Sequence, residues 1–553
     1  MRRWLMLLLV LFLPMVALAE VPALTIDCQG KVTGFQENKL TIHSERAQTL
    51  TLRLEQHGNV WRTMNVSVRA GENVLAWDGL GENEERLPEG KLDLVALTAD
   101  GGEVWRGEIT VGRSENAVLY ALPSSDILYQ ESDWFAEVCA VRQGTLMVEI
   151  YQGERLLDTR RQSVSSGAPF KLHWKGKVGR DVLPEGTYRL RYYMEKSPNW
   201  VRDITVEVRA GAAPVLPVAV TGAVLPSDGD DDAAIWRIMQ KPSVVADVAA
   251  VSHQKVYAGP GKSAEVLGTF HGQSQGMEVF EIREDGWARV GGWNHETGDY
   301  VEGYVPTSNL KVVTPNADYG VLVDKRTQRM AVFYHGERIA EMTISTGLVA
   351  RNKMIRETAA GAFLTLEHME PFSMEGKKYE HVIRYDGGNL MHQLPYRWVS
   401  GCKDYTEGQS QLGQKASHGC IRMDRLPGES GVTAYWLWTH LPWGSRVIIL
   451  DDPAQRLEQA AAVAAGRLPV GQVRSEAATP PLMLPQETEL RLTVGGDAVI
   501  GTREAWWDKT ESLPSYLARS GMDYPFSGLY KVFAEDDMTF VNLECVLKED
   551  KRG

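Results

Sequence analysis

Cysteine is scarce in this chain, with five residues among 553: Cys28, Cys139, Cys402, Cys420 and Cys545. So few scattered cysteines exclude a disulfide-rich scaffold, and no two stand at the short spacing of a metal-binding pair. No stripe of Lys and Arg with interleaved aromatics is present, and 72 acidic residues outnumber 59 basic ones to give a net charge of −13. We therefore expect no nucleic-acid partner.

Long apolar runs are also missing, apart from one at the N-terminus. Arg2 and Arg3 precede an apolar stretch over residues 4–19, which contains Pro14 and ends in small residues before Glu20. These are the three parts of a secretory signal, so we predict a signal peptide over residues 1–19. The alternative is a membrane anchor, but the run is shorter than the ~20 residues that a span needs. We expect an exported protein of the cell wall or periplasm, without a transmembrane segment in the mature chain.

The composition is that of ordinary globular protein, with 43% apolar and 24% charged residues. At roughly 150 residues per domain, the length predicts three to five folded units. Residues 20–211 contain a repeat with a period of about 96 residues, in which Trp77-Asp78-Gly79 and Leu87-Pro88-Glu89-Gly90 return as Trp174-Lys175-Gly176 and Leu183-Pro184-Glu185-Gly186. Each unit continues into strands with period-2 alternation.

This repeat resembles the immunoglobulin-like modules of bacterial surface proteins. The resemblance implies two β-sandwiches, over residues 20–112 and 113–211, that act as spacers. Their tryptophans could line a glycan groove, but a core tryptophan in each sandwich is the simpler interpretation.

Residues 212–245 are predicted to be a linker with a short helix at 233–239. The acidic run before that helix could suggest calcium, but a solvated helix start fits its spacing better. Residues 246–315 then read as short strands that include Tyr257-Ala258-Gly259-Pro260-Gly261, Gly286-Trp287-Ala288-Arg289-Val290 and Gly303-Tyr304-Val305-Pro306. They resemble the bacterial Src-homology-3-like domain, which implies a small barrel that often binds cell-wall peptides.

The chemistry is concentrated in residues 316–452, at the heptad Ser417-His418-Gly419-Cys420-Ile421-Arg422-Met423. In an extended strand alternate residues share a face, so we expect His418, Cys420 and Arg422 on one face, with Ile421 and Met423 in a core. A free thiol is mostly protonated at neutral pH and needs an imidazole to make it a ready nucleophile.

The other residues of the heptad suit acyl transfer as well. The amides of Gly419 and Cys420 could form an oxyanion hole, and Arg422 supplies a fork for a substrate carboxylate. The alternative is that Cys420 is a small buried hydrophobe. Spacing alone does not decide whether His392 or His418 is the base.

The heptad, the T-x-x-G-x-F motif at 358–363 and the upstream His392 closely resemble the YkuD-type L,D-transpeptidase family. The resemblance implies a β-rich catalytic domain in which Cys420 attacks a peptidoglycan stem peptide and releases D-alanine from a thioester intermediate. It also implies that His392 is the base, with one ring nitrogen held by the backbone carbonyl that follows, and that His418 lies beside the oxyanion hole. Ser417 and Arg422 would then contact substrate. No cofactor is expected.

The interval between His392 and His418, 26 positions, is longer than is usual for that family. We assign the excess to a polar loop at 398–408 that could cover the cleft and alter specificity. This loop contains Cys402, which is either a free or buried thiol or the partner of Cys420 in a redox switch.

After a helix and linker at 453–488, residues 489–553 contain a strand that ends in Gly-Asp and another that ends in Asn-Leu-Glu. Both resemble the opening motifs of the CapA-like family of poly-γ-glutamate synthesis, which implies Asp497, Asn542 and Glu544 as remnant metal-site residues. The alternative is ordinary α/β strand ends. About 65 residues are too few for such a domain, so we expect a truncated, incomplete α/β segment that binds no metal.

Together these patterns predict a multidomain, mainly β protein: two β-sandwich repeats, a small barrel, a β-rich catalytic domain and the incomplete C-terminal segment. The leading functional hypothesis is an exported L,D-transpeptidase that forms 3→3 peptidoglycan cross-links. The alternatives are a thiol L,D-carboxypeptidase that trims stem peptides and a non-catalytic cell-wall-binding protein.

Overall fold

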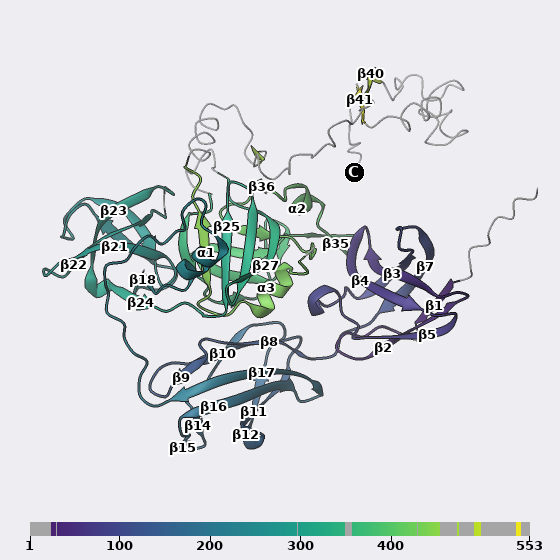
Figure 1. Ribbon diagram of the computed structural model, residues 1–553, viewed down its shortest axis with the longest axis horizontal. Coiled ribbons are helices and arrows are strands. Elements are labelled where there is room, and N and C mark those ends of the chain that lie inside the picture. Colours follow the sequence, from purple (N-terminus) through teal and green to yellow (C-terminus); the bar gives the residue numbers. More distant parts are fainter. Residues whose placement is uncertain are drawn as a thin grey trace, which may run out of the picture. The chain divides into compact units, whose positions relative to one another are not determined.

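The computed structural model describes residues 24–28, 30–295, 297–348, 357–428 and 430–453, together with short strands at 473–474, 492–498 and 538–543. The fold is mainly β, as the alternating patterns predict (Figure 1). The chain divides into two compact units, Met1–Ala478 and Thr479–Gly553. Within the described ranges no helix is both long enough and apolar enough to cross a bilayer. The predicted signal peptide at 1–19 lies outside the described residues.

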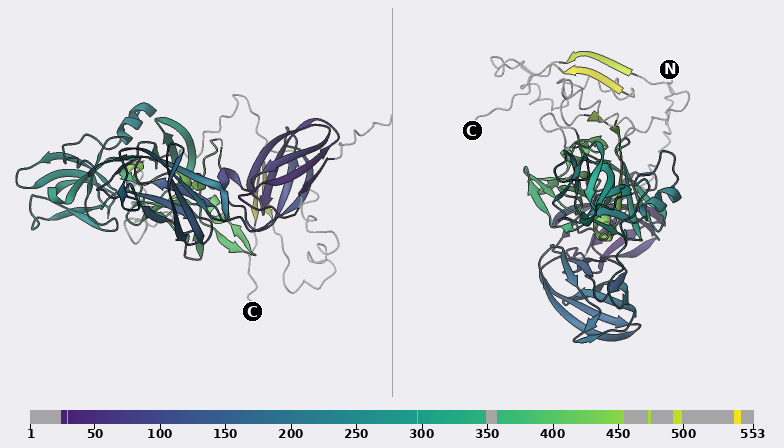
Figure 2. Two further views of the ribbon diagram at one scale, coloured as in Figure 1. Left: turned by 90° about the horizontal axis from the view of Figure 1, so that it is seen from below. Right: turned by 90° about the vertical axis from the view of Figure 1, so that its left-hand side faces the viewer.

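Residues 24–111 form two antiparallel sheets around one core, drawn as the purple strands of Figure 2. One sheet has the order β1-β2-β5 and the other β4-β3-β6-β7. The alternation along β3, which buries Leu50, Leu52 and Leu54, shows how one face of each strand supplies the core. The elements are β1 (Leu24–Cys28), β2 (Asn38–Ser44), β3 (Gln48–Gln56), β4 (Asn59–Val68), β5 (Gly71–Trp77), the 3-10 turn η1 (Glu82–Glu84), β6 (Gly90–Leu97) and β7 (Glu103–Val111).

Residues 118–209 repeat this arrangement with a second core. Here the sheets have the orders β13-β10-β8 and β12-β11-β16-β17-β9, and β14-β15 is a small hairpin. The strands are β8 (Val118–Pro123), β9 (Ile127–Tyr129), β10 (Phe135–Ala140), β11 (Gly144–Gln152), β12 (Arg155–Val164), β13 (Phe170–His173), β14 (Lys177–Val178), β15 (Asp181–Val182), β16 (Gly186–Met194) and β17 (Ser197–Arg209).

The repeated tryptophans have the same role in both pairs of sheets. Trp77 and Trp174 are buried in their cores, and each indole N–H donates to the carbonyl three residues later, at 2.9 Å. Between donor and acceptor lies a glycine with positive φ, 73° at Gly79 and 62° at Gly176, a conformation that a side chain would strain. These two tryptophans are therefore core residues and do not line a groove. The immunoglobulin-like character of the two pairs of sheets stays a prediction.

The helix expected in the linker is confirmed as α1 (Asp232–Met239), and the acidic run caps it, since the Asp231 carboxylate accepts from the Ala234 N–H. The linker ends earlier than predicted. Strand β18 (Ser243–Ala246), whose four residues are all buried, already pairs with β21 and β24.

Residues 243–313 form a seven-stranded sheet with the order β20-β19-β23-β22-β21-β18-β24 around its own core. Its resemblance to a Src-homology-3-like barrel stays a prediction. The further elements are β19 (His253–Tyr257), β20 (Val266–His271), β21 (Gly276–Ile282), β22 (Trp287–Trp293), β23 (Tyr300–Pro306), the 3-10 turn η2 (Thr307–Asn309) and β24 (Leu310–Val313).

From Tyr319 to Leu450 a nine-stranded mixed sheet runs in the order β28-β38-β25-β26-β27-β37-β33-β32-β29. Helix α3 (Ala434–His440) contributes Tyr435, Leu437 and Trp438 to the same core. The strands of the sheet are β25 (Tyr319–Asp324), β26 (Arg329–Tyr334), β27 (Glu337–Ser345), β28 (Gly361–Leu364), β29 (His368–Met369), β32 (Val382–Asp386), β33 (Asn389–Gln393), β37 (Ile421–Met423) and β38 (Arg446–Leu450).

Smaller elements surround this sheet. The hairpins are β30 (Phe372–Met374) with β31 (Lys377–Tyr379) and β34 (Arg397–Val399) with β35 (Cys402–Asp404), α2 spans Thr406–Ser410, and β36 (Gln414–Lys415) pairs with β39 (Val473–Arg474).

In the second compact unit, β40 (Leu492–Ala498) and β41 (Met538–Leu543) pair in parallel, with Asp497 and Asn542 as backbone partners. Glu544 and the helix expected after Asp452 lie outside the described residues. The CapA-like resemblance, and the absence of a metal from this segment, stay predictions.

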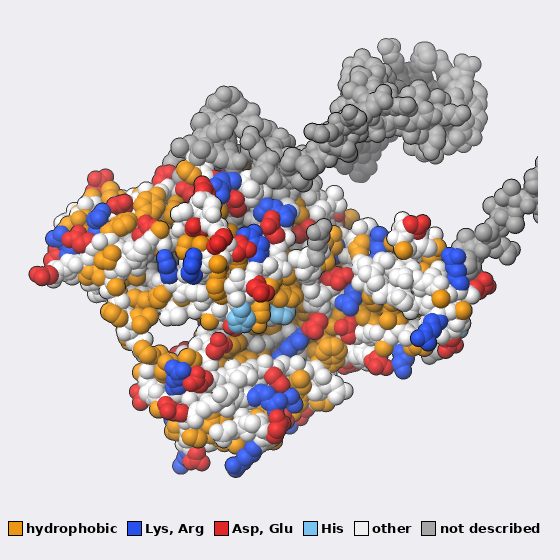
Figure 3. All heavy atoms as spheres, viewed as in Figure 1, with side chains coloured by type: hydrophobic (Ala, Val, Ile, Leu, Met, Phe, Trp, Pro, Cys, Tyr) orange, Lys and Arg blue, Asp and Glu red, His pale blue; other side chains and the backbone are white. Residues whose placement is uncertain are grey.

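Acidic and basic side chains are interspersed over the face of the molecule in Figure 3, without a continuous stripe of Lys and Arg.

Candidate active site

The predicted nucleophile lies at the start of a short strand in the middle of the nine-stranded sheet. Strand β37 pairs in parallel with β33, with Met391 opposite Ile421 and His392 opposite Arg422. Because paired residues of neighbouring strands point to the same face, His392 and Arg422 share a face. Cys420 immediately precedes β37 and packs on the cluster of Tyr379 and Leu390, and the His392 ring also packs on Tyr379. Ile421 and Met423 lie in the core on the other face, as predicted.

The heptad is not one extended strand, contrary to the prediction. β37 begins at Ile421, and His418 and Gly419 lie in a bend where Gly419 has a φ of +118°. A side chain at this position would also collide with Asn389, whose Oδ1 lies 2.3 Å from the place of a Cβ. The strand geometry therefore does not extend to His418, which is exposed on the bend.

His392 is buried and oriented by the backbone. Its Nδ1 lies 2.6 Å from the carbonyl oxygen of Gln393, and the ring packs edge-on against Tyr379 with centroids 5.0 Å apart. Since a carbonyl can only accept, Nδ1 carries the proton of the neutral ring and Nε2 is left as the basic nitrogen. Burial lowers the pKa of His392 to about 4, opposed by the Gln393 carbonyl and reinforced by Arg422, so the ring is neutral at pH 7.

Cys420 is partly exposed and packs with Tyr379 and Leu390. Burial raises the pKa of its thiol; the Leu390 N–H and the charge of Arg422 oppose this, and the Asp386 carboxylate adds to it. The resting group is therefore a thiol and not a preformed thiolate. Such a nucleophile requires a base that removes its proton during attack.

Arg422 is buried without a carboxylate partner among the described residues. One guanidinium nitrogen donates to Gln411 Oε1 at 2.7 Å, whereas Nε is buried and makes no hydrogen bond. Burial lowers the pKa of this guanidinium, yet arginine keeps its charge. A buried cation with an unused donor suits an incoming carboxylate.

The backbone around Gly419 is held on both sides. Its carbonyl accepts from the Thr358 hydroxyl at 2.8 Å and from the Tyr385 hydroxyl at 3.4 Å, while its N–H donates to Ser417 Oγ at 3.2 Å. The Ser417 hydroxyl in turn donates to the Cys420 carbonyl. The Gly419 amide is therefore engaged within the loop, which argues against it as an oxyanion donor and leaves the Cys420 amide from the predicted pair.

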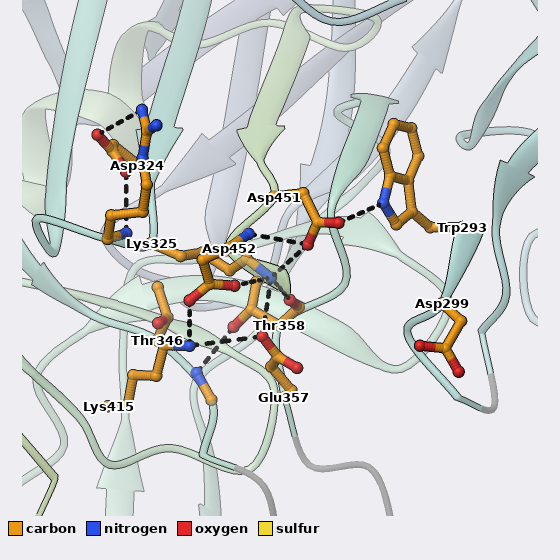
Figure 4. Close-up of polar contacts among 12 residues, drawn as sticks. Trp293, Asp299, Asp324, Lys325, Thr346, Glu357, Thr358, Lys415, Asp451 and Asp452 are labelled. Carbon is orange, nitrogen blue, oxygen red and sulfur yellow. Dashed lines mark hydrogen bonds and ion pairs between the residues drawn. The ribbon is translucent and has the colours of Figure 1, made fainter. Parts of the chain in front are cut away.

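Thr358, the first residue of the T-x-x-G-x-F motif, links this loop to a buried cluster of charges (Figure 4). Lys325 Nζ donates to the Thr358 carbonyl at 3.1 Å and lies 2.9 Å from both Glu357 Oε1 and Asp452 Oδ1. Lys415, two residues before Ser417, pairs with the same two carboxylates. The loop from Ser417 to Cys420 is called the nucleophile loop below. The four charged residues hold Thr358, which binds the Gly419 carbonyl of this loop, and Lys415, which lies just before it.

We expect Lys325→Met to destabilise the catalytic domain by about 3–5 kcal/mol, because it leaves two buried carboxylates, Glu357 and Asp452, with Lys415 as their one remaining cation. Hydrogen exchange of the β25 and β38 amides in the full chain measures this local free energy. Lys39→Met is the control, since Lys39 forms an exposed pair with Glu37 and should contribute little. Equal protection in both variants would contradict the structural role of the cluster.

The expected polar loop at 398–408 is instead a hairpin of β34 and β35 followed by α2, anchored by Lys403 Nζ, which donates to Glu380 Oε2 at 2.7 Å. Cys402 lies on this hairpin as a free thiol and lines a cavity of about 650 Å³ with Tyr405 and His57. Cys420 is also a free thiol and is not among the lining residues. The redox switch thus finds no support in this geometry.

Several residues of this site were not predicted: Tyr379, Tyr385, Asn389, and the cluster of Lys325, Glu357, Lys415 and Asp452. Lysines and carboxylates far apart in a sequence are normally solvated, so only the fold reveals that these four meet.

Residues 318–449 match the sequence model of the YkuD L,D-transpeptidase catalytic domain. No curated protein matches the chain. Among solved structures, the L,D-transpeptidase of Xylanimonas cellulosilytica DSM 15894 is 19% identical with a TM-score of 0.18, over 24% of this chain and 61% of that one.

Two further structures give similar values. The L,D-transpeptidase of Mycobacterium smegmatis is 14% identical with a TM-score of 0.19, over 48% of this chain and 92% of that one. The catalytic domain of the E. faecium enzyme is 20% identical with a TM-score of 0.17, over 24% and 98%. At these scores the family match, and not the structural likeness, carries the assignment. Residues 318–449 are an L,D-transpeptidase catalytic domain of the YkuD family.

Proposed function

We propose that this protein is an exported L,D-transpeptidase that forms 3→3 peptidoglycan cross-links with Cys420 as nucleophile. The observation that carries the proposal is the orientation of His392: its Nδ1 faces the Gln393 carbonyl, which leaves Nε2 as the basic nitrogen, and its ring packs on Tyr379, in the cluster on which Cys420 also packs.

In the acylation step, Cys420 Sγ attacks the carbonyl between the third and fourth residues of a donor stem. His392 Nε2 takes the thiol proton and returns it to the leaving nitrogen, so D-alanine departs and a thioester remains. The amine of a second stem then displaces the thiol to complete the cross-link. The Cys420 amide would stabilise the oxyanion of each step.

Arg422 and its surroundings would bind the donor. A stem peptide ends in a carboxylate, and Arg422, two residues after Cys420, has a buried Nε that makes no hydrogen bond. The same proposal includes export, location in the cell wall or periplasm, sandwiches that act as spacers and a barrel that binds the wall. The N-terminal sequence supports export, and the repeat supports the spacers.

Two other functions predict different products. A thiol L,D-carboxypeptidase would pass the same thioester to water and release tripeptides, and a wall-binding protein would form no adduct. Incubation with tetrapeptide stems and mass spectrometry of the products separates the three: 3→3 dimers support the transpeptidase. Tripeptides alone would favour the carboxypeptidase, and unchanged stems with no thioester would contradict both enzymes.

The lowered pKa of His392 predicts an acid-tolerant reaction. The base must be neutral, and it loses this form only as the pH falls through about 4. We therefore expect kcat/KM for a soluble stem peptide to stay nearly constant from pH 8 down to about 5, and to fall below that. An ordinary histidine would titrate near 6.5. Circular dichroism over the same range controls for unfolding, and an acid limb with a midpoint near 6.5 would contradict the environment described for His392.

A further inference from the structure

Three histidines outside the active site meet at one edge of the seven-stranded sheet. His253 and His271 are direct cross-strand partners in β19 and β20, so their side chains stand on the same face. His295 follows β22 and is held over β20 by its own N–H, which donates to the Thr269 carbonyl at 2.9 Å. The ring centroids lie 3.9–4.6 Å apart. One ring nitrogen of each histidine lies within 4.8 Å of the others.

His271 is the buried member of this cluster, and its polar atoms lack hydrogen bonds. Its side chain is 2% exposed, and Nε2 lies 2.9 Å from Oδ1 of the fully buried Asp386. Nevertheless, neither ring nitrogen of His271 nor Asp386 Oδ1 has a partner in hydrogen-bond geometry. With Nε2 facing Asp386, the buried Nδ1 of His271 is left without a hydrogen-bond partner. Buried polar groups are almost always paired, so this nitrogen points to a ligand that would satisfy it.

Each of the three side chains offers one imidazole nitrogen to the cluster. A neutral imidazole has a lone pair and is the form that binds a metal ion.

We propose that His253, His271 and His295 bind a divalent transition-metal ion of the zinc class. Imidazole nitrogens suit Zn²⁺, which takes tetrahedral sites with Zn–N distances of about 2.0–2.1 Å and therefore donors ~3.4 Å apart. To reach this spacing, each of the three ring nitrogens has to move toward the ion by about 1 Å. Since His253 is exposed, the fourth position opens to solvent.

Asp386 connects this site to the nucleophile loop. It would orient His271 from behind, as carboxylates do for metal-bound histidines. Its second oxygen accepts from Asn389 Nδ2 at 3.1 Å, and Asn389 packs against Gly419. Asp386 is thus a positioning residue between the metal site and Cys420.

The test uses the full chain purified without a polyhistidine tag. After dialysis against Zn²⁺ and then metal-free buffer, elemental analysis should find about one zinc per chain. Titration with Co²⁺ should give the visible absorption of a low-coordinate site. His253→Ala and His295→Ala should each weaken Co²⁺ binding more than 100-fold, and Asp386→Asn by about 10–100-fold. His43→Ala, with a side chain 52% exposed on β2, is the matched control and should bind as the wild type does.

Each outcome decides the proposal. Zinc that is retained by the wild type and by His43→Ala, but lost from His253→Ala and His295→Ala, would support the proposal. In that case Zn²⁺ should raise the melting temperature of the wild type but not of His253→Ala. A chain that retains no zinc and shows no Co²⁺ spectrum would overturn it, leaving His271 as the ion-pair partner of Asp386. Retention unchanged in His253→Ala and His295→Ala would place the metal elsewhere and overturn it equally.

Discussion

Replacing Cys420 by alanine should abolish both cross-linking and the formation of a covalent adduct, while the fold stays intact. Cys420 immediately precedes the strand that carries Arg422, which pairs with the strand of His392, and a thioester requires a thiol as nucleophile. Mass spectrometry of the intact protein after incubation with a stem peptide or a carbapenem measures the adduct. Circular dichroism checks the fold.

Cys402→Ala is the matched control for this experiment. Cys402 is a free, partly buried thiol on the hairpin of β34 and β35, so its loss should leave the adduct unchanged. An adduct that persists in Cys420→Ala and disappears in Cys402→Ala would contradict the assignment of the nucleophile.

His392→Ala should lower kcat/KM for transfer by about 10² or more, the usual effect of removing a positioned base. The reason is the resting thiol: burial raises the pKa of Cys420, so little thiolate exists without a base. Steady-state kinetics with a donor stem and an amine acceptor measure the loss.

His418→Ala tests the alternative assignment in the same assay. His418 lies exposed on the bend before the nucleophile and outside the strand that carries Arg422, so its replacement should have the smaller effect. If His418→Ala were the crippling change and His392→Ala nearly silent, the roles of the two histidines would have to be exchanged.

The sequence was sufficient to predict the β-rich fold and most strands near the site. Alternation in residues 421–423 predicted correctly that Ile421 and Met423 enter the core, because burial of one face is a local property of a strand. It could not show where the strand begins. The bend at Gly419 depends on Asn389, Thr358 and Tyr385, which approach this glycine only in the folded chain.

The contacts that escaped prediction are those between distant segments. His253 and His271 meet because β19 and β20 pair in one register, and a slip by one residue would send one of them to the opposite face. The boundary of the linker was wrong for a similar reason: the short apolar segment at 243–246 becomes a strand only when β21 and β24 supply its partners.

The parallel pairing of β33 with β37 fixes the geometry of the site, whatever the length of the chain that connects the two strands. His392 and Arg422 are neighbours by sheet register, so the distance between the proposed base and the strand that follows the proposed nucleophile does not depend on how many residues connect the two strands. In evolution, this segment can lengthen, fold into a hairpin and helix or exchange its surface residues while the catalytic atoms keep their places. The same freedom lets residues 397–410 change in length and sequence without moving His392 or Arg422.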